Sequence, residues 1–271
     1  MKLPAHQDCL NTTINEVRLC EMLRANRLPA PETLFVDAEG VYPGRPFLIQ
    51  SNLEGYRLSQ WLTMADREEL TGLFSCIGET YKRIHSIKGL KSGVWDGGSE
   101  KTLPISPNDF YFNTEILSDS GKAAFESGII TKSEYVKIQS IWEANLPALK
   151  NHQTALVHGS PFPWTICLLK GEDGNFKVTR LNALGDFLWW DPAYDLPFLL
   201  YPPGYEWSTD WQRSFIAAYG LLPEDWRINL YAILQHLCAL NDIYLAPPDS
   251  PGPRIPNEAV ILRMKKLLAL F

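Results

Sequence analysis

The sequence predicts an α+β protein in which a small strand-containing segment precedes a larger, mostly helical body. Three observations predict this class: two short β-type runs lie between residues 33 and 53, helical periodicity dominates from residue 66 onward, and one strand pair interrupts the helices at residues 165–183. The 271 residues are 45% apolar and 21% charged. This apolar content can offset the chain entropy lost on folding, which excludes disordered and fibrous classes.

The N-terminal part is predicted to be a helix followed by two antiparallel strands. Thr13 and Glu16 have capping-box spacing, which indicates a helix over residues 13–25. Residues 33–40 and 44–53 are apolar runs bounded by glycines, so we expect them to pair as strands. The apolar positions that recur on successive turns of the helix are Ile14, Val17, Cys20 and Leu23.

Helices are predicted for most of the remaining chain. Residues 66–88 carry apolar side chains at helical spacing, and Gly89 is expected to end this helix. Further helices are expected to open at Thr131 with Glu134 and at Thr209 with Gln212, and to cover residues 224–245 and 257–271.

Two segments depart from the helical pattern. Residues 165–183 alternate around the turn residues 171–175, which predicts a β-hairpin. Residues 90–112 are rich in Gly, Ser and Pro, so we expect an ordered surface excursion with no chemistry of its own.

Charge and hydropathy exclude several classes of partner. With 25 basic and 31 acidic residues the net charge is 25 − 31 = −6, and no basic cluster is present, so we expect no nucleic-acid partner. Apolar runs are far shorter than the roughly 20 residues that span a bilayer, so we expect no membrane partner. The five cysteines have neither zinc nor disulfide spacing and are expected to be reduced thiols of a cytoplasmic protein (Cys9, Cys20, Cys76, Cys167, Cys238).

Three segments resemble the aminoglycoside phosphotransferase and choline kinase family. Residues 16–58 are similar to its helix, strand and hinge region, residues 156–168 (LVHGSPFPWTICL) to its catalytic loop, and residues 181–196 (LNALGDFLWWDPAYDL) to its metal-binding segment. The resemblance implies a protein-kinase-like fold. Its small β-containing lobe, truncated at the N-terminus, would occupy residues 1–55, and its helical lobe residues 56–271.

The family's catalytic side chains are replaced in this sequence. By the resemblance, Ser160 stands in the position of the catalytic aspartate, Phe162 in that of the second loop histidine, and Thr165 in that of the metal-binding asparagine. Ala183 stands where the magnesium-binding aspartate is expected, while His158 matches a histidine that braces the loop. We therefore expect a degenerate member, a pseudokinase without phosphoryl transfer, with no metal site and with Mg-ATP not used as a cofactor.

The nucleotide side of the family pattern is also incomplete. The glycine-rich hairpin that the family places over the phosphates does not precede residue 16. The opening residues do resemble the strand that carries the phosphate-binding lysine. On that match Lys2 would contact a nucleotide and Glu16 would be its partner on the following helix.

An aromatic group surrounds the altered loop. The replacements turn an anionic metal-binding cleft into a nearly neutral, apolar one, which favours an uncharged small organic ligand. Phe162, Trp164, Thr165 and Trp189 are the candidate ligand-binding residues. The alternative explanation is that these aromatics, with Trp190, pack in a core beneath the loop.

The main prediction is a pseudokinase that binds a small molecule or a protein partner. Two alternatives stay open. In a repurposed enzyme, a member of a biosynthetic set, His158, Ser160 or Asp186 would move a proton during an isomerisation or cyclisation of an organic metabolite. In a residual small-molecule kinase, displaced carboxylates would replace the lost ones. Asp186, three residues beyond Ala183, is the candidate for that role.

Overall fold

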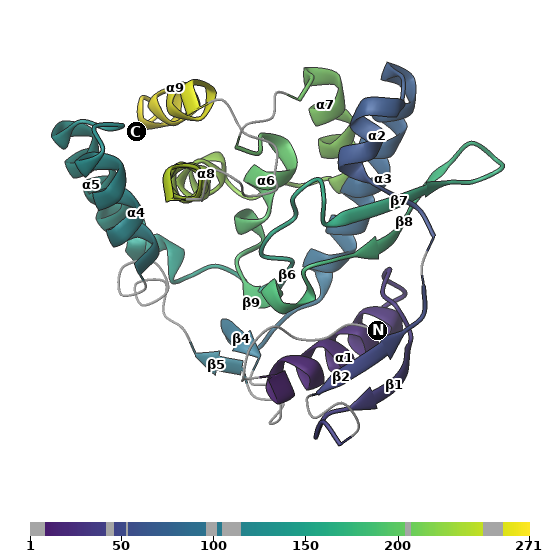
Figure 1. Ribbon diagram of the computed structural model, residues 1–271. Coiled ribbons are helices and arrows are strands. Elements are labelled where there is room, and N and C mark those ends of the chain that lie inside the picture. The colour runs from purple at the N-terminus through teal and green to yellow at the C-terminus, as the bar shows by residue number, and fades with distance from the viewer. Residues whose placement is uncertain are drawn as a thin grey trace. The chain divides into compact units, whose positions relative to one another are not determined.

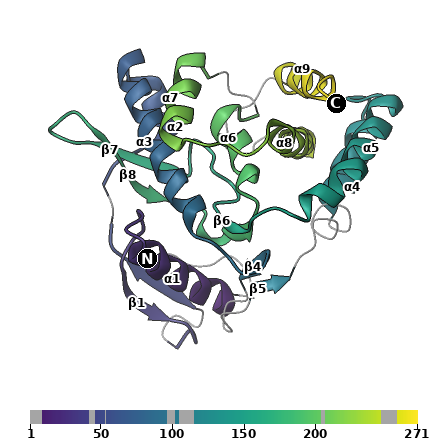
Figure 2. The ribbon, with the colours of Figure 1, turned by 180° about the vertical axis from the view of Figure 1, so that it is seen from behind.

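A helix beside a two-stranded sheet opens the chain in the computed structural model (Figures 1 and 2). Helix α1 (Cys9–Ala25) lies alongside strands β1 (Thr33–Asp37) and β2 (Phe47–Gln50), which pair antiparallel with Phe35 opposite Ile49. The structure describes residues 9–41, 46–52, 54–95, 102–104, 115–203, 207–245 and 257–271. The predicted helix and strand pair are confirmed.

The start of α1 differs from the prediction. The helix begins four residues before Thr13, so Thr13 and Glu16 lie inside the helix and are buried, at 1% and 6% exposure. The spacing that resembled a capping box therefore belongs to a helix interior.

Two long helices pack side by side in the first part of the body. Helix α3 (Arg67–Ser86) starts with a capping box in which Asp66 and Glu69 bond each other's backbone N–H groups, at 3.0 and 2.8 Å. It packs against α7 (Thr209–Tyr219), and a Cβ at Gly78 would approach the Phe215 carbonyl oxygen to 2.5 Å. The close approach of the two helices therefore requires glycine at this position. The hydroxyl of Ser208 accepts from Trp211 N, so α7 is capped one residue earlier than predicted.

Two further antiparallel sheets carry the loops of interest. In the first, β7 (Ile166–Lys170) and β8 (Phe176–Leu181) form the predicted hairpin, and β3 (Tyr56–Arg57), which leads into α2 (Leu58–Met64), pairs with β7. The second sheet has the order β5-β4-β9-β6. Its strands are β4 (Gly93–Trp95), β5 (Thr102–Pro104), β6 (Ala155–Val157) and β9 (Leu188–Trp190). Strands β4 and β5 occupy part of the segment predicted to be a surface excursion.

The remaining helices assemble around α8. Helix α8 (Asp225–Leu245) contacts four other helices, namely α4 (Glu115–Glu126), α5 (Lys132–Leu149), α6 (Leu196–Leu200) and α9 (Asn257–Leu268). The predicted capping box at Thr131 and Glu134 is confirmed at the start of α5. Two single-turn 3₁₀ helices, η2 (Leu184–Asp186) and η3 (Pro192–Tyr194), flank β9.

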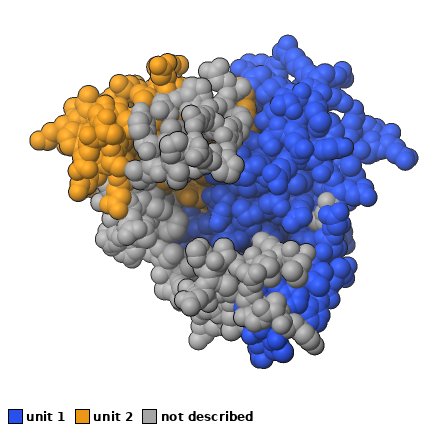
Figure 3. Space-filling view, in the orientation of Figure 1, with its two compact units in different colours: residues 1–104, 154–190, 208–221 blue, residues 105–153, 191–207, 222–271 orange. Residues whose placement is uncertain are grey.

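The chain divides into two compact units (Figure 3). Unit 1 contains residues 1–104, 154–190 and 208–221, and unit 2 contains residues 105–153, 191–207 and 222–271. The expected lobe boundary between residues 55 and 56 lies inside unit 1, and the lobe division stays a prediction. In the part of the chain that the structure describes, no helix combines the length and the apolar character needed to cross a membrane.

Candidate functional site

The loop between β6 and β7 is the centre of the candidate site, and His158 braces it from within. The imidazole is fully buried, and its Nδ1 accepts a hydrogen bond of 3.3 Å from Ser160 N. The rings of Tyr81 and Phe187 lie 6.2 and 4.6 Å from it, centroid to centroid. Because His158 lies in the core, its geometry suits a brace of the loop better than a group that contacts a ligand.

Ser160 and Asp186 are brought together at the surface of unit 1. The Ser160 hydroxyl donates a hydrogen bond to Asp186 Oδ2, although the two residues are 26 positions apart. Asp186 is exposed at the end of η2, and Ser160 is half-buried. The contact depends on Gly159, whose φ is +84° and where a Cβ would lie 2.2 Å from the Asp186 backbone oxygen. A carboxylate is therefore held directly against the loop position where the resemblance expects the catalytic group.

The Thr165 hydroxyl is turned toward the backbone of the loop. Its Oγ1 lies 2.8 Å from the carbonyl oxygen of Phe162 and 3.1 Å from that of Ser160, and the residue is 4% exposed. The hydroxyl hydrogen is shared between these two acceptors. The Thr165 side chain thus links the end of the loop to the backbone of Ser160 and Phe162.

Two aromatic rings stack on the same loop. The rings of Phe162 and Trp164 are parallel to within 7°, with centroids 4.4 Å apart. Phe162 is half-buried, whereas Trp164 is 36% exposed. Between them, the Pro163 carbonyl oxygen accepts a 2.9 Å hydrogen bond from Ser59 N at the start of α2. The stack is therefore attached to a helix as well as to the loop.

Sequence comparison identifies the family of this chain. A family model described as the phosphotransferase enzyme family matches residues 1–228. The chain belongs to this family. No curated protein matches the chain.

Solved structures of other phosphotransferases share the fold. The chain is 14% identical to APH(2")-IIia in its GDP and kanamycin complex, with a TM-score of 0.64 over 99% of this chain and 84% of that one. It is 14% identical to APH(4)-Ia in complex with AMP-PNP and hygromycin B, with a TM-score of 0.62 over 97% and 84%. For the macrolide 2'-phosphotransferase MphH from Brachybacterium faecium the identity is 17% and the TM-score 0.57, over 90% and 79%. The predicted protein-kinase-like α+β fold is confirmed.

Thr165 and Ala183, at the positions where the resemblance expects metal ligands, do not fit a magnesium ion. Mg²⁺ is held by carboxylate and other oxygen ligands. Ala183 offers none, and the Thr165 hydroxyl is bonded to backbone carbonyls, which leaves Asp186 as the one acidic side chain on loop 158–165 and η2. Among the residues that the structure describes, no group of three His, Cys, Asp or Glu side chains could hold a metal ion.

The other predicted site residues lie in different surroundings. Trp189 on β9 packs its ring over Gly89, where a Cβ would come within 2.7 Å of its Cε3 atom, and Trp190 is fully buried. Glu16 is buried on α1, a helix that packs against η2. Lys2, its predicted nucleotide-binding partner, lies outside the described residues.

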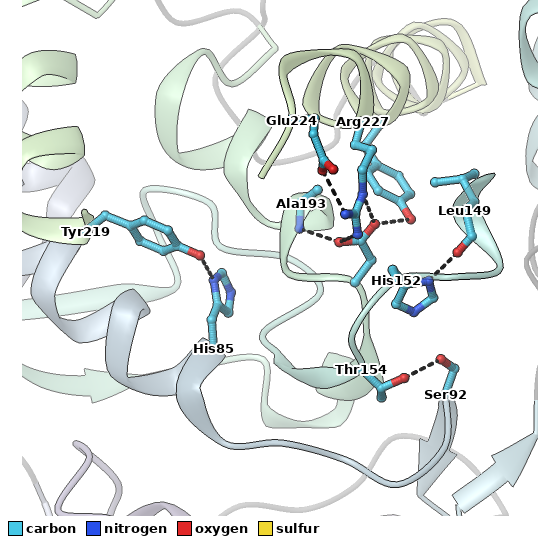
Figure 4. A network of polar contacts seen from close by, with 11 residues as sticks. His85, Ser92, Leu149, His152, Thr154, Ala193, Tyr219, Glu224 and Arg227 are labelled. Carbon is cyan, nitrogen blue, oxygen red and sulfur yellow. Dashed lines mark hydrogen bonds and ion pairs between the residues drawn. The ribbon is translucent and has the colours of Figure 1, made fainter. Parts of the chain in front are cut away.

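One polar network of unit 2 was not predicted from the sequence (Figure 4). Asp191 is fully buried, accepts from Ala193 N at 3.0 Å, and forms an ion pair with Arg227, whose Nη2 and Nε lie 2.6 and 3.0 Å from its two oxygens. Tyr231 OH and Glu224 complete the network. No signal in the sequence links Asp191 to Arg227 on α8, because the two residues are 36 positions apart.

Proposed function

We propose that the chain is an enzyme that acts by proton transfer on a small hydroxyl-bearing organic molecule, with Asp186 as the proton acceptor. The observation that carries the proposal is the hydrogen bond from the Ser160 hydroxyl to Asp186 Oδ2. It places a carboxylate in the orientation that accepts a hydroxyl hydrogen at this loop. Such positioned groups contribute roughly 10²- to 10⁴-fold to rates.

The proposed step uses the two oxygens of one carboxylate. Ser160 donates to Oδ2, and a substrate hydroxyl donates to Oδ1. The proton of the substrate hydroxyl passes to Asp186 as that oxygen forms a bond to an electrophilic carbon of the same molecule, in an isomerisation or cyclisation, and Asp186 then returns the proton to the product. His158 holds the loop, and Gly159 allows Asp186 to approach it.

Phosphoryl transfer is less well supported, although the family is named for it. That reaction depends on charge stabilisation around the phosphates, and losing one such contact costs about 3 to 4 kcal/mol in other enzymes. Here Thr165 and Ala183 stand where two metal ligands are expected. The Thr165 hydroxyl is bonded to a backbone carbonyl and Ala183 has no side-chain oxygen, so neither residue supplies a ligand for a metal ion.

A second candidate function is ligand binding without turnover. It is favoured by the Thr165 hydroxyl, which serves the loop rather than a cation, and by the stacked pair of Phe162 and Trp164. In this case a pseudokinase would hold a small organic molecule or present its bound state to a protein partner.

An activity screen separates these functions. The purified protein is incubated with fractions of a small-metabolite extract, with and without Mg-ATP, and consumption and products are followed by mass spectrometry. Asp186→Asn is compared with Glu172→Gln, which removes an exposed carboxylate at the tip of the hairpin.

The expected result is a compound consumed without ATP by the wild type and by Glu172→Gln, and at least about 100-fold more slowly by Asp186→Asn. A product that gains one phosphate group from ATP would overturn the proposal in favour of a residual small-molecule kinase. Saturable binding with no turnover by any variant would establish the ligand-binding function instead.

A further inference from the structure

We propose that the substrate of this site is a planar aromatic alcohol, whose ring stacks on Trp164 while its hydroxyl donates to Asp186. The inference rests on the proposed function, because it names the class of molecule that Asp186 acts on. It adds a requirement that a hydroxyl alone does not set, namely a flat ring.

The first observation is a stack with an accessible outer member. The rings of Phe162 and Trp164 lie 4.4 Å apart and nearly parallel. Trp164 is 36% exposed, which makes it the most exposed tryptophan whose burial the structure describes. Parallel aromatic rings attract one another beyond the area that they bury, and a third ring can continue such a stack.

The second observation is that hydrogen bonds hold the backbone that carries the stack. Phe162 N donates to Ser160 O at 2.8 Å, the Thr165 hydroxyl bonds the Phe162 and Ser160 carbonyls, and Pro163 O is bonded to Ser59 N. Binding to a preorganised surface loses little conformational freedom. An aromatic ligand therefore meets a ring on an ordered loop, whereas an aliphatic ligand of the same size gains no stacking.

The third observation is a polar pair of which one member, Ser160, is on the same loop and the other, Asp186, is on η2. Ser160 is two residues from Phe162 and four from Trp164. The proposed ligand spans these groups, with its ring on Trp164 and the hydroxyl at its edge toward the carboxylate. The negative charge of Asp186 disfavours an anionic ligand such as a nucleotide at the same place.

The test compares two primary alcohols, 2-naphthalenemethanol and decahydro-2-naphthalenemethanol, by ligand-observed NMR titration. Their hydroxyl groups are of the same kind, but only the first probe has a planar aromatic skeleton. We expect the wild type to bind 2-naphthalenemethanol about three- to tenfold more tightly. Trp164→Leu should abolish this difference, and Trp226→Leu, a half-buried tryptophan on α8, should retain it.

Asp186→Ala separates the two parts of the argument. We expect it to weaken both probes by a similar factor and to leave their ratio unchanged. Equal affinities of the two probes for the wild type, or a ratio that Trp164→Leu does not change, would overturn the aromatic substrate class while the role of Asp186 stands. Unchanged affinities in Asp186→Ala would instead overturn the proposed function and the hydroxyl part of this inference.

Discussion

Gly159 is the residue on which the geometry of the candidate site depends most directly. Its positive φ alone disfavours a side chain by about 1 kcal/mol, and a Cβ would collide with the Asp186 carbonyl oxygen at 2.2 Å. Gly174, at the tip of the hairpin, has a similar φ of +82° with no atom within 4 Å of its Cβ position. The two glycines therefore have a similar φ, and only Gly159 has a close contact at its Cβ position.

We predict that Gly159→Ala lowers the free energy of unfolding by at least about 2 kcal/mol more than Gly174→Ala does, because backbone displacement adds to the dihedral strain. Urea denaturation of both variants measures the difference. Equal losses would show that the loop and η2 can separate at no cost, and that the Ser160–Asp186 contact does not require glycine.

His236 on α8 is a second residue with a measurable consequence. The side chain is 1% exposed, and this burial is the main reason that its pKa is lowered from 6.5 to about 4. The hydrogen bond between its Nδ1 and Ala232 O opposes the shift, and the charge of Arg263 lowers the pKa further. The unfolded chain thus takes up a proton at a higher pH than the folded chain. The contribution of neutral His236 to stability is complete above pH 6.5 and is lost as the pH falls toward 4.

We predict a loss of about 3 kcal/mol from this residue across that pH range, at 1.36 kcal/mol per pKa unit. His236→Gln should flatten the decline in unfolding free energy between pH 7 and pH 4, and His152→Gln, at a half-buried position, should retain most of it. Parallel pH profiles for the wild type and His236→Gln would contradict the assignment.

At the scale of elements, the sequence predicts those whose signals are local. The starts of α3 and α5 are set by capping boxes within four residues, and the β7–β8 hairpin by its turn. Strands β6 and β9 were not predicted, because three-residue strands exist only through pairing with distant partners. The predicted start of α1 was wrong for the opposite reason. Thr13 and Glu16 match the local capping-box pattern, but both side chains are buried inside the fold.

The buried ion pair of Asp191 and Arg227 is one of the contacts that join η3 to α8. We predict that Arg227→Met lowers the free energy of unfolding by about 3 kcal/mol, because Asp191 would keep its charge in a buried position without its cation. The double variant Asp191→Asn/Arg227→Met should lose less than the sum of the two single changes.

Chemical denaturation of the three variants provides the measurement. Arg67→Met serves as the control, because Arg67 pairs with Asp210 at the exposed surface and its loss should change stability little. Additive losses in the double variant would show that Asp191 and Arg227 stabilise the fold independently.

At the scale of the whole molecule, three separated motifs predicted the fold and the family, while the site could be predicted only in part. Ser160 and Asp186 were each identified, but spacing along the chain cannot show that residues 26 positions apart are in contact. Trp189 was grouped with the loop because it lies in residues 181–196, which resemble the family's metal-binding segment. Alternation along β9 instead buries Trp190 and directs Trp189 onto Gly89.

The thermal stability of the whole fold responds to any magnesium or nucleotide that it binds. A ligand that binds only the folded state raises the melting temperature, by the equivalent of about 2.7 kcal/mol at 100 times its Kd. With Thr165 closing the loop and no side-chain oxygen at Ala183, we predict that Mg-ATP raises the Tm of the wild type no more than ATP alone. A rise of several degrees that needs both components would contradict this and revive the kinase hypothesis.

Restoring carboxylates should reverse that behaviour. Ala183 already has a left-handed backbone, with φ 56° and ψ 41°, a conformation that aspartate adopts more readily than alanine. Ser160→Asp places a second carboxylate beside Asp186. Without metal, the double variant Ser160→Asp/Ala183→Asp should therefore be less stable than the wild type, because its carboxylates repel one another. Mg²⁺ should raise the Tm of this double variant. Adding Thr165→Asn should cost about a further 1 to 2 kcal/mol, since it removes the hydroxyl that bonds two loop carbonyls. If the double variant melts at the same temperature with and without Mg²⁺, residues 160 and 183 do not face a common cation.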